Sequence, residues 1–290
     1  MTNVTFTSPT DTLELIGAPS IFTGFFLAQF GLKDWYSGAE SKSEVNERPQ
    51  ARGAFGISND FASSLAISTQ GSFDGDSLAD AITAAERLSA IAAGVPVLMT
   101  VEDPLRTTSR WVSVRRVTLP PDVGAFASFD FSIDVLATDP LRYGEPVSTF
   151  TGIPVSGGGL LWPLGTTALE FWDWGDDGAS GRVSITNVGT ADVWPTLTVE
   201  GGVAEGFVAT NVDSGMTIRF VRPIPAGSSV SINQRTGSAS IDGQSDVGGF
   251  ITERGFFFIP AGATQQIQFA PLGAITGTPK FTVTLSPGYL

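Results

Sequence analysis

Short segments in which apolar and polar residues alternate recur along the sequence, and this period of two constrains the fold most strongly. In residues 126–136, Phe129, Phe131, Ile133 and Val135 share one face of an extended chain, and polar residues occupy the other. Turns separate such segments, and 34 Gly and 18 Pro accompany 21 Phe residues. That composition favours many short strands over helices. The sequence therefore predicts a mainly β protein.

One segment departs from this period and predicts a helix over residues 77–93. Apolar residues recur there at spacings of three and four: Leu78, Ile82, Ala85, Leu88 and Ala92. Asp76 or Ser77 is suited to cap the N-terminus, and Gly94 the C-terminus. We expect an amphipathic surface helix with one buried face.

A stretch rich in Gly, Pro, Ser and Thr divides the chain. Residues 1–142 read as a β-domain with one helix, and residues 143–168 as a linker that contains Gly157–Gly159. Eight or nine short strands follow in residues 169–290, without a convincing helix. We expect the second domain to be an antiparallel β-sandwich.

The absence of both His and Cys restricts the chemistry of the chain. Ser-His-Asp and Cys-His nucleophiles need an imidazole, and zinc, haem and iron–sulfur sites take His or Cys ligands. An oxygen-ligand Ca²⁺ or Mg²⁺ site and a carboxylate pair of the glycosidase kind remain open. No motif pairs any two of the 29 acidic residues. We therefore expect no catalytic residues, no metal site and no cofactor, so that the chain is not an enzyme.

The formal net charge of −13 argues against binding to nucleic acid or to an anionic membrane surface. Eighteen uncharged residues lie between Glu14 and Lys33, but Pro19 and several Gly and polar residues interrupt them. We expect no membrane insertion, and a soluble protein made in the cytoplasm.

Two groups of residues are candidates for binding. The first is a set of tryptophans that suits a carbohydrate or partner platform: Trp162, Trp172, Trp174 and Trp194. Acidic residues Glu170, Asp173, Asp176 and Asp177 surround two of them, but their spacing does not match a calcium loop and favours a solvated acidic turn.

The second group lies in a long polar loop over residues 33–59, which contains Arg48 and Arg52. The planar fork of Arg suits carboxylates on an acidic neighbour, so this loop reads equally as an interface clamp or as ordinary surface charge.

The order of several motifs resembles phage distal tail proteins, also called minor tail proteins of siphoviruses. In the first half these are Gly31–Tyr36 and Arg48–Gly56, and Asp139–Gly144 with Gly157–Pro163 resembles the family's interdomain segment. In the second half they are Asn187–Ala191, Trp194-Pro195, Val199–Gly201, Ile232–Gly237, Ile241–Gly243 and Ile259–Gly262. The resemblance covers nearly the whole chain, and it departs at Arg52, where a His-like residue is expected.

The resemblance implies a split-barrel-like N-terminal domain that forms a ring, expected to be a hexamer, and a galectin-like C-terminal sandwich. Such a ring links the tail tube protein to the tail hub or tail-tip protein in the baseplate, and supports fibres or receptor-binding proteins. The expected location is the virion tail, assembled in the host cytoplasm. We expect the ring or partner contacts to include Trp35, Arg48 and Arg52.

A second function stays open beside this one. The C-terminal sandwich is also suited to a carbohydrate-binding adhesin that acts at the host surface, with its exposed tryptophans in a groove.

Overall fold

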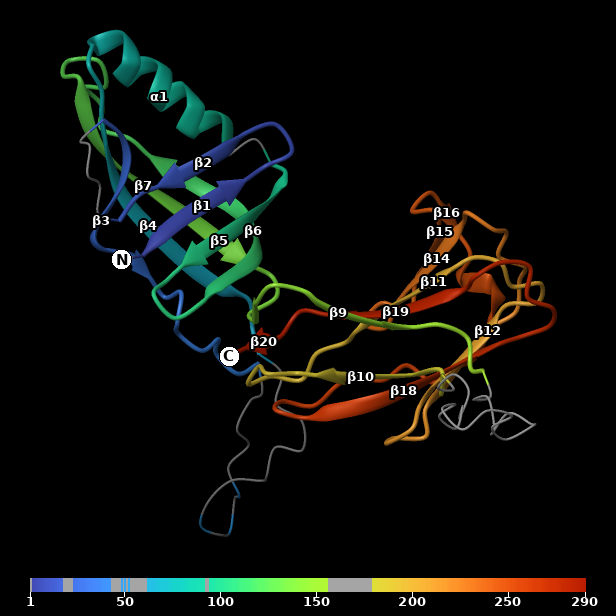
Figure 1. Ribbon diagram of the computed structural model, residues 1–290. Helices are drawn as coiled ribbons and strands as arrows, with labels where there is room; N and C mark the ends of the chain where they lie inside the picture. The colour runs from blue at the N-terminus through green and yellow to red at the C-terminus, as the bar shows by residue number, and fades with distance from the viewer. Residues whose placement is uncertain are drawn as a thin grey trace, which may run out of the picture. The chain divides into compact units, whose positions relative to one another are not determined.

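The computed structural model describes residues 2–17, 23–42, 48, 50, 52, 62–91, 94–155 and 179–290. The chain divides into two compact units, Met1–Gly144 with Tyr289–Leu290 (unit 1) and Glu145–Gly288 (unit 2). Figure 1 labels the elements of both. We describe each unit by itself.

Unit 1 is built on one antiparallel sheet in the order β2-β1-β5-β6-β7-β4-β3. Its strands are β1 (Asn3–Thr7), β2 (Thr12–Leu15), β3 (Gly24–Lys33), β4 (Leu65–Asp74), β5 (Pro96–Glu102), β6 (Thr107–Thr118) and β7 (Ser128–Ala137). The short strands β8 (Arg142–Tyr143) and β20 (Gly288–Tyr289) add to it beside β6. In β4 and β7 buried residues alternate strictly with more exposed ones, so each strand turns one face to the core and the other away from it.

The two edges of this sheet meet at a short parallel bridge between Ile16 and Phe26. The N–H of Ile16 donates to the carbonyl of Phe25 at 3.2 Å, and the N–H of Leu27 donates to the carbonyl of Ile16 at 3.0 Å. This bridge pairs the first half of β3 with Ile16, the residue after β2. The second half of β3 lies beyond the bridge, at the edge of the sheet.

Helix α1 (Leu78–Ile91) contacts β4, β6 and β7, as Figure 1 shows. Ser77 caps it, because the N–H of Asp80 donates to its Oγ at 3.2 Å. The predicted buried face was partly wrong. The helix buries Ala81, Ala84, Ala85, Leu88 and Ile91, whereas Leu78 and Ile82 are 51% and 46% exposed. Small alanines let the helix approach the sheet closely, and Ala92 lies outside the described residues.

The core of unit 1 includes four phenylalanines from β3, β4 and β7. The ring of Phe25 lies 4.9 Å from that of Phe73 and 5.9 Å from that of Phe131. Phe129 lies 5.4 Å from Phe73. Phe129 and Phe131 are inward residues that the alternation in β7 predicts, so the period of two correctly identified their place in the core.

Unit 2 is a sandwich of two antiparallel sheets. One has the order β10-β18-β12-β13-β17 and the other β16-β15-β14-β11-β19-β9. The strands are β9 (Val147–Thr151), β10 (Arg182–Thr186), β11 (Thr196–Glu200), β12 (Phe207–Asn211), β13 (Thr217–Phe220), β14 (Ser229–Asn233), β15 (Ala239–Ile241), β16 (Ser245–Asp246), β17 (Ile251–Arg254), β18 (Thr264–Pro271) and β19 (Lys280–Leu285). A 3₁₀ turn, Gly248–Phe250, precedes β17.

The two sheets of unit 2 pack through aromatic rings. Phe269 on β18 and Phe281 on β19 stack with their centroids 5.1 Å apart and their planes at 4°. Phe207 and Phe220 extend this group, and all four side chains are fully buried. Residues on both inner faces thus interdigitate as in an aligned sandwich.

The chain is mainly β, with α1 as its single α-helix among the described residues, in agreement with the predicted fold class. The expected linker differs from the structure, because residues 147–151 form β9 and pair with β19. The part of that segment from 156 to 168, with Gly157–Gly159, lies outside the described residues. No described helix has both the length and the apolar character needed to span a membrane.

Candidate functional site

Strand β3 carries a bulge between its two paired segments. Leu27 pairs with Gly71 and Leu32 pairs with Thr69, so that residues 28–31 on β3 stand opposite the single residue Gln70 on β4. Bulges of this kind re-aim side chains and often lie beside functional sites. This one displaces its central residues from the ladder.

Phe30 lies at the tip of this bulge in an uncommon conformation. Its φ angle is 59°, and its side chain is 85% exposed. A bulky residue in the left-handed region is a genuine outlier, and holding it there costs about 1–3 kcal/mol. Strain of this kind persists only where the surroundings impose it and clusters at functional sites. An exposed, strained phenylalanine therefore marks this edge as a candidate contact.

Two glycines let the strands approach closely enough to form the bulge. A Cβ on Gly31 would lie 2.2 Å from the carbonyl oxygen of Gln70. A Cβ on Gly71 would lie 2.4 Å from the carbonyl oxygen of Phe26 and 2.7 Å from the ring of Phe131. Only glycine fits at such a separation.

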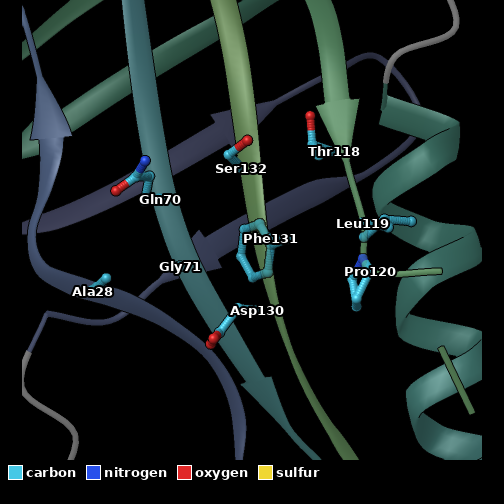
Figure 2. Close-up of a pocket in the computed structure, with 9 residues that line it drawn as sticks. All are labelled: Ala28, Gln70, Gly71, Thr118, Leu119, Pro120, Asp130, Phe131 and Ser132. Atoms are coloured by element: carbon cyan, nitrogen blue, oxygen red, sulfur yellow. The ribbon is translucent and has the colours of Figure 1, made fainter. Parts of the chain in front are cut away.

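A hollow of about 480 Å³ lies beside the bulge. Figure 2 shows the ring of Phe131 at its centre, with Ala28, Gln70 and Gly71 on one side and Leu119 and Pro120 on the other. Asp130, Thr118 and Ser132 supply polar groups. Asp130 also lines a second hollow, of about 380 Å³, over β3, β4 and β7. The ring of Phe131 packs in the core and is only 5% exposed, so the accessible side chains of this hollow are polar ones, chiefly those of Gln70, Asp130 and Ser132 on the outer face of the sheet.

A second notable cluster surrounds Trp35, which the sequence predicts as a contact residue. Trp35 is buried, with only 1% of its surface exposed. Arg110, equally buried, donates to the carbonyl of Trp35 at 2.8 Å and to that of Pro140 at 2.7 Å. Its guanidinium lies 4.8 Å from the Trp35 ring. The ring of Trp35 therefore belongs to the interior of unit 1 and not to its surface.

Two more arginines stack on aromatic rings in the same cluster. Arg142 lies 4.9 Å from the ring of Tyr36, and Arg106 lies 4.3 Å from the ring of Tyr289. The hydroxyl of Tyr36 donates to Asp103 at 3.0 Å. These contacts attach the last residues of the chain and the segment after β3 to unit 1.

Burial sets the protonation behaviour of this cluster. Desolvation lowers the pKa of Arg110 to about 10, which still leaves the guanidinium charged at neutral pH. Burial and the hydrogen bond to Asp103 raise the pKa of Tyr36. For Asp103 the effect of burial is outweighed by hydrogen bonds from the N–H groups of Arg106 and Leu105 and from Tyr36, so its pKa is lowered. Arg110 is therefore charged, Asp103 ionised and Tyr36 protonated near pH 7.

The other predicted contact residues fall partly outside the described chain. Arg48 and Arg52 are exposed, but most of their loop, residues 43–47, 49, 51 and 53–61, is not described. Trp162, Trp172 and Trp174, with the acidic residues around them, are also outside the described residues. Trp194 is 40% exposed, next to Phe258 and Arg235. In the part of the chain that is described, no three acidic side chains are grouped to hold a metal ion.

Sequence reasoning missed Phe30 and Arg110. Phe30 lies in an apolar run that reads as an ordinary strand, and the adjacent Gly31 is the only hint of a bulge. Arg110 begins an alternating segment, where a charged residue is expected to point outward. Its burial depends on Trp35 and Pro140, which are distant in sequence.

No protein-family model matches the sequence, and no curated protein matches it significantly. Solved structures do match. The crystal structure of the SPP1 Dit protein (gp 19.1), described as a paradigm of the hub adsorption apparatus in phages that infect Gram-positive bacteria, is 11% identical. The match covers 91% of this chain and 93% of that one, with a TM-score of 0.59. The chain has the fold of a phage Dit protein.

Two structures of the phage P2 baseplate in its activated conformation, one with Ca and one with Sr, also contain a similar chain. Each is 13% identical, with a TM-score of 0.57 and 98% of both chains covered. Identities this low show a shared fold rather than a shared activity. The resemblance to phage distal tail proteins is confirmed at this level, because the match extends over both units.

Proposed function

We propose that the chain is a structural component of a phage tail that assembles through unit 1 into a ring, with six copies. The observation that carries this proposal is the extent of the structural match, which covers 91% of the chain and 93% of the SPP1 Dit protein. A partial match would support a shared module, whereas this one includes both units. The proposed role is assembly, so it assigns no catalytic side chain.

In this proposal the ring joins the tail tube protein to the tail hub or tail-tip protein, and unit 2 supports fibres or receptor-binding proteins. The location is the virion tail. These roles follow from the sequence motifs that resemble distal tail proteins and from neighbours that are hub and baseplate proteins.

The bulge of β3 supplies a contact for this assembly. Phe30 is exposed on this bulge, and it would insert as a knob into a different surface of the neighbouring copy. A ring requires such a heterologous contact, repeated until the rotation closes. Arg48 and Arg52 are proposed as a second contact, toward carboxylates of an acidic neighbour.

Assembly is tested directly on the purified full-length chain. Native mass spectrometry and negative-stain electron microscopy at rising concentration are expected to show a closed ring of six. Tail tubes from the same phage serve as a template where the ring needs one to close. A chain that stays monomeric at high concentration and also on tail tubes would contradict the proposal.

The contact is tested by Phe30→Gly, which removes both the ring and the backbone strain. We expect the free energy of unfolding to rise by about 1 kcal/mol, because glycine tolerates the positive φ. Ring formation is expected to fall at the same time, because the knob is lost. Gain of stability with loss of assembly is not the pattern of a merely structural residue.

Phe126→Gly is the matched control, since Phe126 is also exposed, at 67%, but lies in the turn before β7 and not on the bulge. It is expected to leave assembly unchanged. If Phe30→Gly assembles like the parent chain, the ring contact lies elsewhere on unit 1.

A further inference from the structure

The outer face of the six-stranded sheet in unit 2 holds a polar groove of about 350 Å³. Along β14, Val230 and Ile232 point into the core, so Ser231 and Asn233 point outward. Four Ser and Thr hydroxyl groups line the groove, together with three planar polar side chains, those of Asn233, Gln244 and Asp246. Its volume lies at the lower end of the range for small-ligand sites, about 300–1,000 Å³.

Hydrogen bonds hold Asn233 and Asp246 in place, and all three planar side chains keep bonding capacity. Oδ1 of Asn233 accepts from the N–H groups of Arg235 and Thr236, at 2.9 and 3.2 Å. Oδ1 of Asp246 accepts from the N–H of Gly248 at 2.8 Å. Among the described residues, Nδ2 of Asn233, Oδ2 of Asp246 and the side-chain amide of Gln244 have no protein partner. The groove thus offers fixed donors and acceptors side by side.

An exposed aromatic ring adjoins this groove. Thr196, which lines it, pairs with Asn233 across β11 and β14. The N–H of Gln234 donates to the carbonyl of Pro195 at 3.3 Å, so the pairing continues toward Trp194 and Arg235. Trp194 and Arg235 are therefore neighbours, with the guanidinium of Arg235 5.8 Å from the centre of the Trp194 ring.

Trp194 therefore lies on the outer face, about 7 Å along the strand from the groove. It is 40% exposed, and the ring of Phe258, itself 43% exposed, lies 5.9 Å away. An exposed aromatic pair thus lies next to the polar groove along the strand.

We propose that the groove and Trp194 form a binding site for a neutral oligosaccharide. Sugar hydroxyls both donate and accept, which matches an array of amide, carboxylate and hydroxyl groups. The C–H face of a sugar ring is apolar and suits an exposed indole. Asp246 in the groove and the net charge of −13 disfavour an acidic saccharide. This site is independent of ring assembly, because all its residues belong to one copy of unit 2.

The test uses the full-length chain on an array of neutral, amino and acidic oligosaccharides, followed by calorimetry with the neutral one that binds most strongly. We expect saturable binding of a neutral oligosaccharide. Trp194→Ala is expected to weaken it about tenfold or more, and Gln244→Ala by several-fold. Trp194→Phe is expected to restore part of the affinity, because it keeps an aromatic face.

Phe250→Ala is the matched control. Phe250 is also an exposed aromatic residue of unit 2, at 43%, with a guanidinium, that of Arg222, 4.9 Å from its ring. It is expected to leave the affinity unchanged. The proposal is overturned if no neutral oligosaccharide binds at millimolar concentration, or if only acidic ones bind. It is also overturned if Trp194→Ala and Gln244→Ala bind as well as Phe250→Ala does.

Discussion

Unit 1 and unit 2 both bury polar side chains that bond to backbone carbonyls, but unit 1 buries a charge and unit 2 buries amides. In unit 1, Arg110 reaches the carbonyls of Trp35 and Pro140. In unit 2, Asn187 donates to the carbonyls of Ala191 and Ile259, at 2.8 and 3.1 Å. Both side chains thus fasten distant segments to a sheet.

The difference lies in the electrostatic cost of the two solutions. A buried guanidinium must replace its hydration, and Arg110 does so with two carbonyls and the face of an indole, while its Nε has no partner in the structure. A neutral amide is far cheaper to bury when it is hydrogen-bonded. The stability of unit 1 therefore depends strongly on Arg110. The following variants measure the contrast between the two units, in order of expected effect.

Arg110→Ala is expected to lower the free energy of unfolding of unit 1 by about 3–5 kcal/mol, because it leaves a cavity and two buried carbonyls without a donor. Urea unfolding, with hydrogen exchange to assign the transition to unit 1, measures this. Arg115→Ala on the exposed side of β6 is the control and is expected to change little. Arg110→Met separates charge from packing. If Arg110→Met lowers the free energy of unfolding as much as Arg110→Ala does, the lost hydrogen bonds matter more than the lost side-chain volume.

Asn187→Ala is expected to lower the free energy of unfolding of unit 2 by about 1–3 kcal/mol, since the amide's donors and its acceptor for the N–H of Gly189 are all lost. Asn187→Asp turns carboxylate oxygens toward these carbonyls in a buried site, so it is expected to destabilise unit 2 at least as much as Asn187→Ala. The same unfolding measurement, assigned to unit 2, applies. A loss equal to that of Arg110→Ala would remove the contrast between the two units.

The smallest expected effect is a pH dependence at the surface of unit 1. Arg87 on α1 binds Asp11 through two hydrogen bonds, at 2.6 and 2.8 Å, and these lower the pKa of Asp11. A carboxyl whose pKa is lowered on folding stabilises the fold above its ordinary value near 3.8, and this contribution disappears as pH falls through the lowered value. Both side chains are about 40% exposed, so we expect less than about 1 kcal/mol.

The measurement is the difference in unfolding free energy between the parent chain and Asp11→Asn, at pH 7 and near pH 2. We expect the difference to vanish in acid and to shrink at high salt. In unit 2, Arg219 meets Glu253 through a single contact of 3.2 Å, and Arg219→Ala is expected to have no measurable effect. A difference that persists unchanged at pH 2 would show that Asp11 acts through packing rather than charge.

Local patterns predicted the elements well. The alternation over 126–136 corresponds to β7 at Ser128–Ala137, and the helix expected over 77–93 is α1 at Leu78–Ile91. Both depend on the period of the sequence, which a strand or helix expresses within its own length. The helix face was predicted less well, because the sheet beneath it selected the alanines.

The candidate sites were predicted less completely. Trp35 was expected at a contact and is buried under Arg110, whereas Trp194 is exposed beside a polar groove. Both are tryptophans, so residue type alone does not separate them. Tertiary contacts do, because Trp35 lies in the bend after β3 and packs against Arg110, whereas Trp194 lies on the outward side of its segment.

The sequence by itself determined that this chain is mainly β, that one helix interrupts the strands of its first half, and that no imidazole or thiol is present for catalysis. Only the tertiary structure decided that Phe30 is forced outward on a bulge and that Arg110 is buried. Periodicity acts over neighbouring residues, whereas these two conformations are imposed by Gln70 and by Pro140, which the chain brings near only when the sheet has formed.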